Sequence, residues 1–278
     1  MTTTVTCSDA SAAAGEALGG TASRASRWLL VEVRGAWGRD AVADSRLPDD
    51  VRETLGGFPG SVILIRRPDR RAGVTIIQAT ASEEGGTARR QEVASLDEIP
   101  RVDLEGGEPI AGALLLVCSH GRRDACCARL GVPLFDAFTE RVPRTHLWQA
   151  SHLGGHRFAP NVLVVPHGLQ FGRIPVARGI ELAGALAEGR IPLDLYRGRT
   201  IYEPHVQAAE IAIRAARGLD RVADLSFVSQ DGERVIFSTP TGVVTALVSE
   251  IEGPNVPASC GKDPEPTVAW VASLESAS

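Results

Sequence analysis

The feature that most restricts the fold of this 278-residue chain is a series of short apolar runs, each bounded by glycine, proline or charged residues. Such runs predict buried strands, and the amphipathic segments between them predict helices. The runs at residues 28–33, 110–117 and 161–165 are far shorter than the ~20 residues that a membrane-spanning helix needs. We therefore expect an α/β (α+β) protein that makes no use of a membrane.

Composition shifts divide the chain into three predicted regions, at residues 1–105, 106–195 and 196–278. In the first region the pattern predicts a helix near residues 48–55 and strands at 27–33, 62–66 and 74–79. The polar, glycine-containing stretch 82–91 has no face to bury, so it is expected to be a loop. The region is thus an N-terminal α/β unit.

The middle region has a more regular pattern. It predicts, in chain order, a strand at 113–117, a helix from Asp124 to about 141, strands at 145–149, 161–165 and 169–174, and a helix at 177–188. This order of β-α-β, β-hairpin and α is that of a thioredoxin-like fold, and the first region is similar enough to suggest a degenerate copy of it. The last region predicts a helix at 205–217, strands at 224–229, 234–238 and 243–250, and an irregular tail around 254–266.

Charge and cysteine content narrow the function. The net charge of −5 and the pI near 5.7 argue against nucleic-acid binding, which requires a basic face. The N-terminus has no signal-peptide pattern, so a cytoplasmic location is expected. Of the five cysteines, three lie within residues 118–127, and in a reducing compartment such clustering indicates metal or redox chemistry. Cys7 and Cys260 receive no role and are expected to be buried or free thiols.

Four residues form a candidate metal site. Cys118 ends a predicted strand, and Cys127 follows nine residues later at the start of a helix. His152 and His156 flank two glycines, which would cost a helix roughly 2 kcal/mol relative to alanine, so the pair is placed on a tight loop. Thiolate and imidazole together favour zinc or an iron–sulfur centre. The residues alone leave both metals open.

The same residues allow other interpretations. A single cysteine at a strand end is more often a small apolar packing residue. The sequence has no C-x-x-C pair, and Cys118-Ser119-His120 matches only the first half of a Rieske motif. Nucleotide-binding, metalloprotease and serine-hydrolase motifs are missing from the sequence, and no carboxylate pair indicates a glycosidase.

Two segments carry a family resemblance. Residues 118–127 read CSHGRRDACC and residues 148–161 read WQASHLGGHRFAPN, and both resemble the sucrase/ferredoxin-like family. The resemblance implies a thioredoxin-like ferredoxin with a [2Fe–2S] cluster, bound on one iron by Cys118 and Cys127 and on the other by His152 and His156. Cys126 fills a position that varies in the family, so either neighbouring thiol could be the ligand. The residues give no support to sucrase activity.

The resemblance also implies a function. It predicts a non-catalytic electron carrier that takes up one electron with a proton and exchanges it with redox partner proteins. The residues expected beside the cluster are His120, Arg122, Arg123, Asp124 and Cys126. One alternative is a zinc-binding structural or interaction protein that uses the same four ligands, with Zn in place of the cluster. Another is a thioredoxin-type thiol oxidoreductase that uses Cys126 with Cys127, or Cys7.

Overall fold

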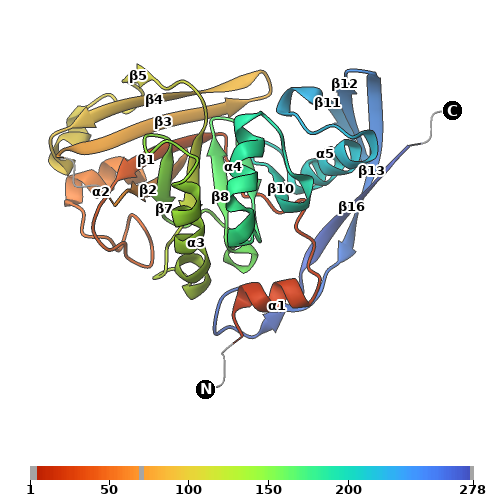
Figure 1. The fold of residues 1–278 in the computed structure, drawn as a ribbon, viewed down its shortest axis with the longest axis horizontal. Helices are drawn as coiled ribbons and strands as arrows, with labels where there is room; N and C mark the ends of the chain where they lie inside the picture. Colours follow the sequence, from red (N-terminus) through yellow and green to blue (C-terminus); the bar gives the residue numbers. More distant parts are fainter. Residues whose placement is uncertain (1–4, 69–71, 276–278) are drawn as a thin grey trace.

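The computed structural model describes residues 5–68 and 72–275, and its centre is a ten-stranded curled sheet (Figure 1). From one edge to the other, the strands are β10 (Tyr196–Arg199), β9 (Leu169–Phe171), β8 (Val162–Val165), β6 (Leu114–Cys118), β7 (Leu147–Ala150), β2 (Ser61–Arg66), β1 (Arg27–Glu32), β3 (Val74–Ser82), β4 (Gly85–Val93) and β5 (Glu108–Pro109). The helices are α1 (Cys7–Ala13), α2 (Asp49–Gly56), α3 (Ala125–Phe138), α4 (Gly179–Ala187) and α5 (Pro204–Arg217). The predicted mixed α/β class is confirmed.

The sheet contains the same arrangement twice. In the first half, β1 pairs in parallel with β2 and antiparallel with β3, which pairs with β4. In the second half, β6 pairs in parallel with β7 and antiparallel with β8, which pairs with β9. The first two strands of each half are connected through a helix, α2 or α3. This shared topology is what a degenerate copy predicts.

The register of the two halves also agrees. Leu30 lies opposite Ile77 in the first half, and Leu116 lies opposite Leu163 in the second. Two residues further along, β1 ends at Glu32 and β6 ends at Cys118. The first half therefore carries a carboxylate at the position where the second half carries the thiol predicted to bind metal.

The two halves join through β2 and β7, which run antiparallel with Ile65 opposite Ala150. Because the sheet curls, its inner faces share one apolar cluster that includes Trp28, Leu30, Leu116 and Trp148. The outer faces are covered separately, by α2 over the first half and by α3 and α4 over the second (Figure 1). The division at residues 105 and 195 stays a prediction, and the sheet is continuous across both of these positions, since β10 pairs with β9.

The C-terminal region forms a second sheet of β11 (Ser226–Asp231), β12 (Arg234–Thr239), β13 (Gly242–Glu252) and β16 (Val268–Leu274), which packs on α5. Between β13 and β16 the chain forms a small hairpin of β14 (Val256–Pro257) and β15 (Pro264–Glu265). This hairpin lies beside α1, so a segment from the start of the chain and one from the C-terminal region meet (Figure 1). Within the described residues, no helix is long and apolar enough to cross a membrane.

Two local predictions were wrong. Residues 82–91 were expected to be a loop, yet β3 extends to Ser82 and β4 starts at Gly85, so the turn is very short. Ala88 is buried in the inner cluster and Val93, on the opposite face, is buried against the α2 side, whereas Arg89 and Glu92 are exposed, so β4 is a largely solvated strand fixed by pairing with β3. The tail near 254–266 was expected to be irregular, but it contains the β14–β15 hairpin.

Candidate metal centre

Cys118 and Cys127 are brought together by the packing of α3 against the end of β6. Gly131 allows this approach, because a Cβ at that position would overlap the carbonyl oxygen of Cys118. The Asp124 carboxylate accepts a hydrogen bond from the Cys126 backbone N–H (3.0 Å) and thereby caps α3. Both thiols are fully buried, with exposures of 1% for Cys118 and 0% for Cys127.

His152 and His156 lie on the loop that follows β7, as predicted. Gly154 and Gly155 have φ angles of 84° and 63°, in the left-handed region that favours glycine. A Cβ on Gly154 would overlap Ser23, and one on Gly155 would overlap the Arg197 guanidinium. Glycine at both positions therefore lets the loop pack closely against Ser23 and Arg197.

The four predicted residues converge. The ligand atoms of Cys118, Cys127 and His152 all lie within 4.8 Å of one another. The rings of His152 and His156 are neighbours, with centroids 5.1 Å apart. Within the described residues, His152 Nδ1 and both ring nitrogens of His156 are buried and make no hydrogen bond. Buried nitrogens without hydrogen bonds are rare in native proteins, and a bound metal would satisfy one nitrogen of each imidazole.

The electrostatics of the two thiols are coupled. The hydrogen bond between Cys127 and Cys118 lowers the pKa of Cys118 well below its usual range, and His152 lowers it further. The same hydrogen bond raises the pKa of Cys127. Burial lowers the pKa of His156 and so favours the neutral imidazole, which is the form that binds metals.

The residues predicted to lie beside the centre have different positions. His120 is buried: its Nε2 contacts the Gly38 carbonyl oxygen (2.6 Å), and its Nδ1 accepts the backbone N–H of His152 (3.2 Å). Asp124 is also buried, with Oδ2 3.7 Å from His156 Nε2. Arg122 and Arg123 are exposed, and their role beside the centre stays a prediction.

Cys126 faces away from the centre. Its sulfur lies 3.4 Å from that of Cys7 and 3.2 Å from that of Cys260. The sequence left open which neighbouring thiol approaches the histidines, and in the structure it is Cys127. Cys7 is buried as expected, and Cys260 is partly exposed.

Sequence reasoning missed Arg197 and Asn161. Arg197 is fully buried and donates to Asn161 Oδ1 (2.8 Å) and to the Gly154 carbonyl oxygen (3.1 Å), and Asn161 Nδ2 donates to the Gly155 carbonyl oxygen (2.9 Å). These contacts fix the backbone of the loop of residues 152–156, called here the histidine loop. Arg197 lies far along the chain in a segment with no motif, so only Asn161, which is within the family-like segment 148–161, carried any sequence signal.

Fold and site together define an α/β protein with a buried group of thiols and imidazoles that could bind a metal. Residues 18–198 match the family model described as Sucrase/ferredoxin-like. The chain belongs to that family, as the resemblance of its cysteine and histidine segments predicted.

Curated relatives of this chain include fungal proteins named Altered inheritance of mitochondria protein 32. The one from Clavispora lusitaniae is 32% identical over 113 residues, or 37% of this chain and 41% of the relative. The one from Meyerozyma guilliermondii is 33% identical over 121 residues, or 39% of this chain and 43% of the relative. The matches thus span less than half the length of these relatives. No solved structure matches the chain significantly.

These names correct the predicted function. An iron–sulfur electron carrier with proton-coupled reduction was expected, with zinc-binding and thiol-oxidoreductase alternatives, yet the relatives are named for mitochondrial inheritance and give no direct support for electron transfer. The electron-carrier prediction is therefore wrong. The physical reason is that a donor set determines which group can bind, whereas the use of that group depends on surfaces and partners that two short motifs do not specify.

Proposed function

We propose that this chain is a metal-binding protein whose Cys118, Cys127, His152 and His156 hold a [2Fe–2S] cluster. The observation that carries the proposal is the set of three buried imidazole nitrogens that make no hydrogen bond, beside two adjacent buried thiols. Thiolates and imidazoles are a known ligand combination for such clusters, with two cysteines on one iron and two histidines on the other.

The position of His156 supports a cluster over a single ion. Around one tetrahedral zinc, ligand atoms lie within about 3.8 Å of one another. His156 is not part of the group of three whose ligand atoms fall within 4.8 Å, although its ring adjoins that of His152. A core of two metals and two sulfides is wide enough to reach both histidines.

Burial and hydrogen bonding around the four ligands favour binding of the cluster. Burial of both sulfurs excludes water, and the hydrogen bond from the His152 backbone to His120 fixes the position of the first histidine. Because the cysteine ligands must be reduced, we also propose that the protein works in a reducing compartment such as the cytoplasm. The fungal relatives are named for mitochondrial inheritance, and for this chain we propose metal binding alone.

The test is the iron and acid-labile sulfide content of anaerobically purified protein. We expect about two of each per chain in the wild type. His152→Ala and Cys127→Ser should each lose most of both. His205→Ala is a matched control, because His205 lies on α5, bonded to Gln230 and away from the centre. Full iron content in the first two variants, or a colourless wild type, would contradict the proposal.

A further inference from the structure

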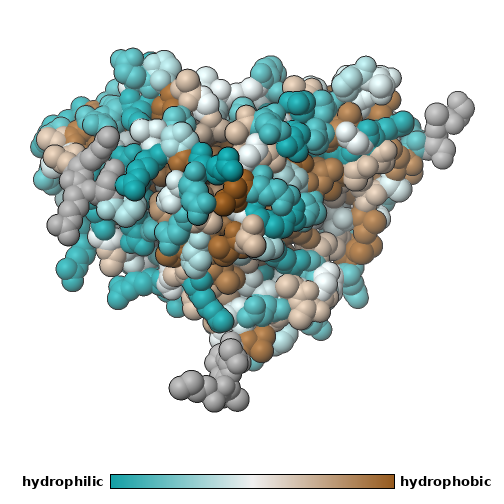
Figure 2. Space-filling view, in the orientation of Figure 1, coloured by the Kyte–Doolittle hydropathy of each residue, from teal (hydrophilic) through white to brown (hydrophobic). Residues whose placement is uncertain are grey.

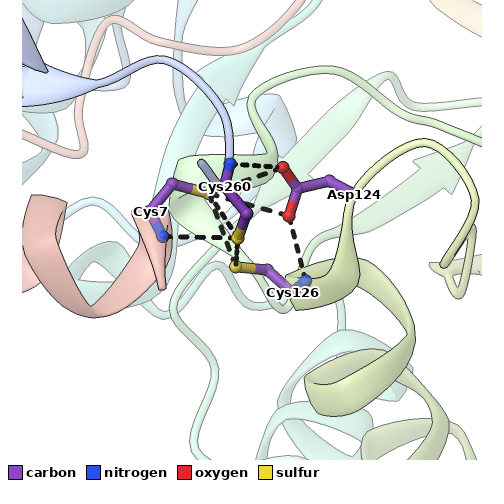
Figure 3. Close-up of side chains that lie close together, drawn as sticks. All are labelled: Cys7, Asp124, Cys126 and Cys260. Atoms are coloured by element: carbon purple, nitrogen blue, oxygen red, sulfur yellow. Dashed lines mark hydrogen bonds between the residues drawn. The ribbon is translucent and has the colours of Figure 1, made fainter. Parts of the chain in front are cut away.

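A second cluster of thiols lies on the other side of the first turn of α3. It consists of Cys7, Cys126, Cys260 and the Asp124 carboxylate, whose ligand atoms all lie within 4.8 Å of one another (Figure 3). The three sulfurs are 3.2 to 3.6 Å apart, and both Asp124 oxygens are 3.8 Å from Cys7 Sγ. None of these residues is a ligand of the proposed iron–sulfur centre, although Asp124 Oδ2 also lies 3.7 Å from His156 Nε2.

Three distant parts of the sequence supply this cluster. Cys7 begins α1, Cys126 lies in the first turn of α3, and Cys260 lies between β14 and β15. Asp124 connects them, because its carboxylate accepts the backbone N–H of Cys126 (3.0 Å), the backbone N–H of Cys260 (2.8 Å) and the Ser259 hydroxyl (2.8 Å). In Figure 3 the three sulfur atoms point toward one another, with the Asp124 carboxylate beside them.

The geometry fits a zinc ion. Around one tetrahedral zinc with Zn–S bonds of about 2.3 Å, the sulfurs lie about 3.8 Å apart, close to the spacing found here. Soft thiolate donors select zinc over magnesium or calcium. The backbone N–H of Cys7 donates to Cys260 Sγ (3.5 Å), which offsets part of the negative charge of a thiolate.

We propose that Cys7, Cys126, Cys260 and Asp124 form a structural zinc site that ties α1 and the β14–β15 hairpin to the start of α3. On binding, the three thiols release their protons to solvent and each sulfur bonds the metal, with one carboxylate oxygen as the fourth ligand. The site supports the helix turn that presents Cys127 to the other centre. It goes beyond the proposed function, since it uses different ligands and a different metal.

The first test is metal analysis with zinc-edge X-ray absorption on the full-length wild-type protein. We expect one zinc per chain, surrounded by three sulfurs at about 2.3 Å and one oxygen. Absence of zinc overturns the proposal. A shell of two sulfurs and two nitrogens also overturns it, because that shell would place zinc at the Cys118 centre.

Paired variants separate the two centres. Cys260→Ser, chosen because Cys260 is partly exposed, should lose its zinc and keep its iron. Cys118→Ser, the matched control, should lose iron and keep zinc. Retention of zinc by Cys260→Ser would refute the zinc site, whereas loss of zinc together with iron in Cys118→Ser would also refute it as a separate site. If Cys260→Ser fails to fold, the wild-type absorption spectrum decides.

Discussion

At the scale of single residues, Glu32 and Cys118 show how one strand position serves two purposes. Both lie at the same register position of a central strand, but the Glu32 carboxylate is satisfied within its own half. It accepts hydrogen bonds from Arg34 Nε (2.9 Å) and from the Thr75 backbone N–H (3.2 Å). In the second half the corresponding thiol faces Cys127 and His152 instead. In the first half the side chain at the end of the strand is therefore hydrogen-bonded. In the second half the side chain at the same position lies beside other possible metal ligands.

The Glu32 contacts predict a pH dependence of stability. Burial alone would raise the pKa of Glu32, but the hydrogen bonds from Arg34 and Thr75 lower it below its usual value. The ionised carboxylate therefore stabilises the fold above the unfolded-state pKa of about 4.3, and this stability is lost as the pH falls through the lower folded-state pKa. Urea titrations from pH 7 to pH 3 should show a smaller decrease in unfolding free energy for Glu32→Gln than for wild type. Equal pH slopes would contradict this assignment.

A substitution at His120 should lower both the stability of the fold and the retention of iron. Replacement by alanine removes the contact with Gly38 and leaves the His152 backbone N–H without its acceptor. We expect a loss of roughly 1–3 kcal/mol in stability. We also expect faster loss of iron to a chelator. His146→Ala, at a partly exposed histidine bonded to Ala111, is the control and should release iron at the wild-type rate.

At the scale of elements, the histidine loop depends on β10, which comes much later in the chain. Arg197 on β10 contacts the loop and Thr21 at the same time, and burial lowers its pKa to about 9, so it stays charged at neutral pH. The elements that carry Cys118, Cys127 and both histidines were predictable, because strand runs, a helix cap and paired glycines are local signals. The support from Arg197, and the division of Cys126 and Cys127 between two clusters, depend on contacts between distant segments that periodicity does not encode.

A substitution at Arg197 tests this support. Arg197→Met retains much of the apolar volume but leaves Asn161 and the Gly154 carbonyl without their donor. We expect a stability loss of roughly 2–3 kcal/mol, because hydrogen bonds to a charged group are among the stronger ones. Hydrogen exchange should accelerate at residues 152–156. Unchanged exchange there would show that the loop is held by other contacts.

At the scale of the whole molecule, the two halves share one inner cluster although few strand residues pair between them. The β13–β16 sheet on α5 is more loosely covered: Figure 2 shows apolar patches among the hydrophilic surface on that side of the molecule, and Val243, Leu247, Val268 and Val271 are exposed. The predicted redox partners stay a prediction. The shared apolar cluster, in contrast, links the stability of one half to that of the other.

We predict that the two halves unfold together. Leu30→Ala in the first half should cost about 2–5 kcal/mol, the usual range for a buried leucine. Because Leu30 packs in the cluster that contains Leu116 and Trp148, hydrogen exchange should accelerate in β6 and β8 as well as in β1 and β3. Acceleration confined to the first half would show that the halves are independent units.

The most direct test of the metal centre is an anomalous difference map, recorded at the iron absorption edge from crystals grown without oxygen. Our account predicts iron density enclosed by Cys118 and Cys127 on one side and by His152 and His156 on the other. An absence of iron density between these four side chains, or iron density at the Cys7, Cys126 and Cys260 cluster instead, would contradict it.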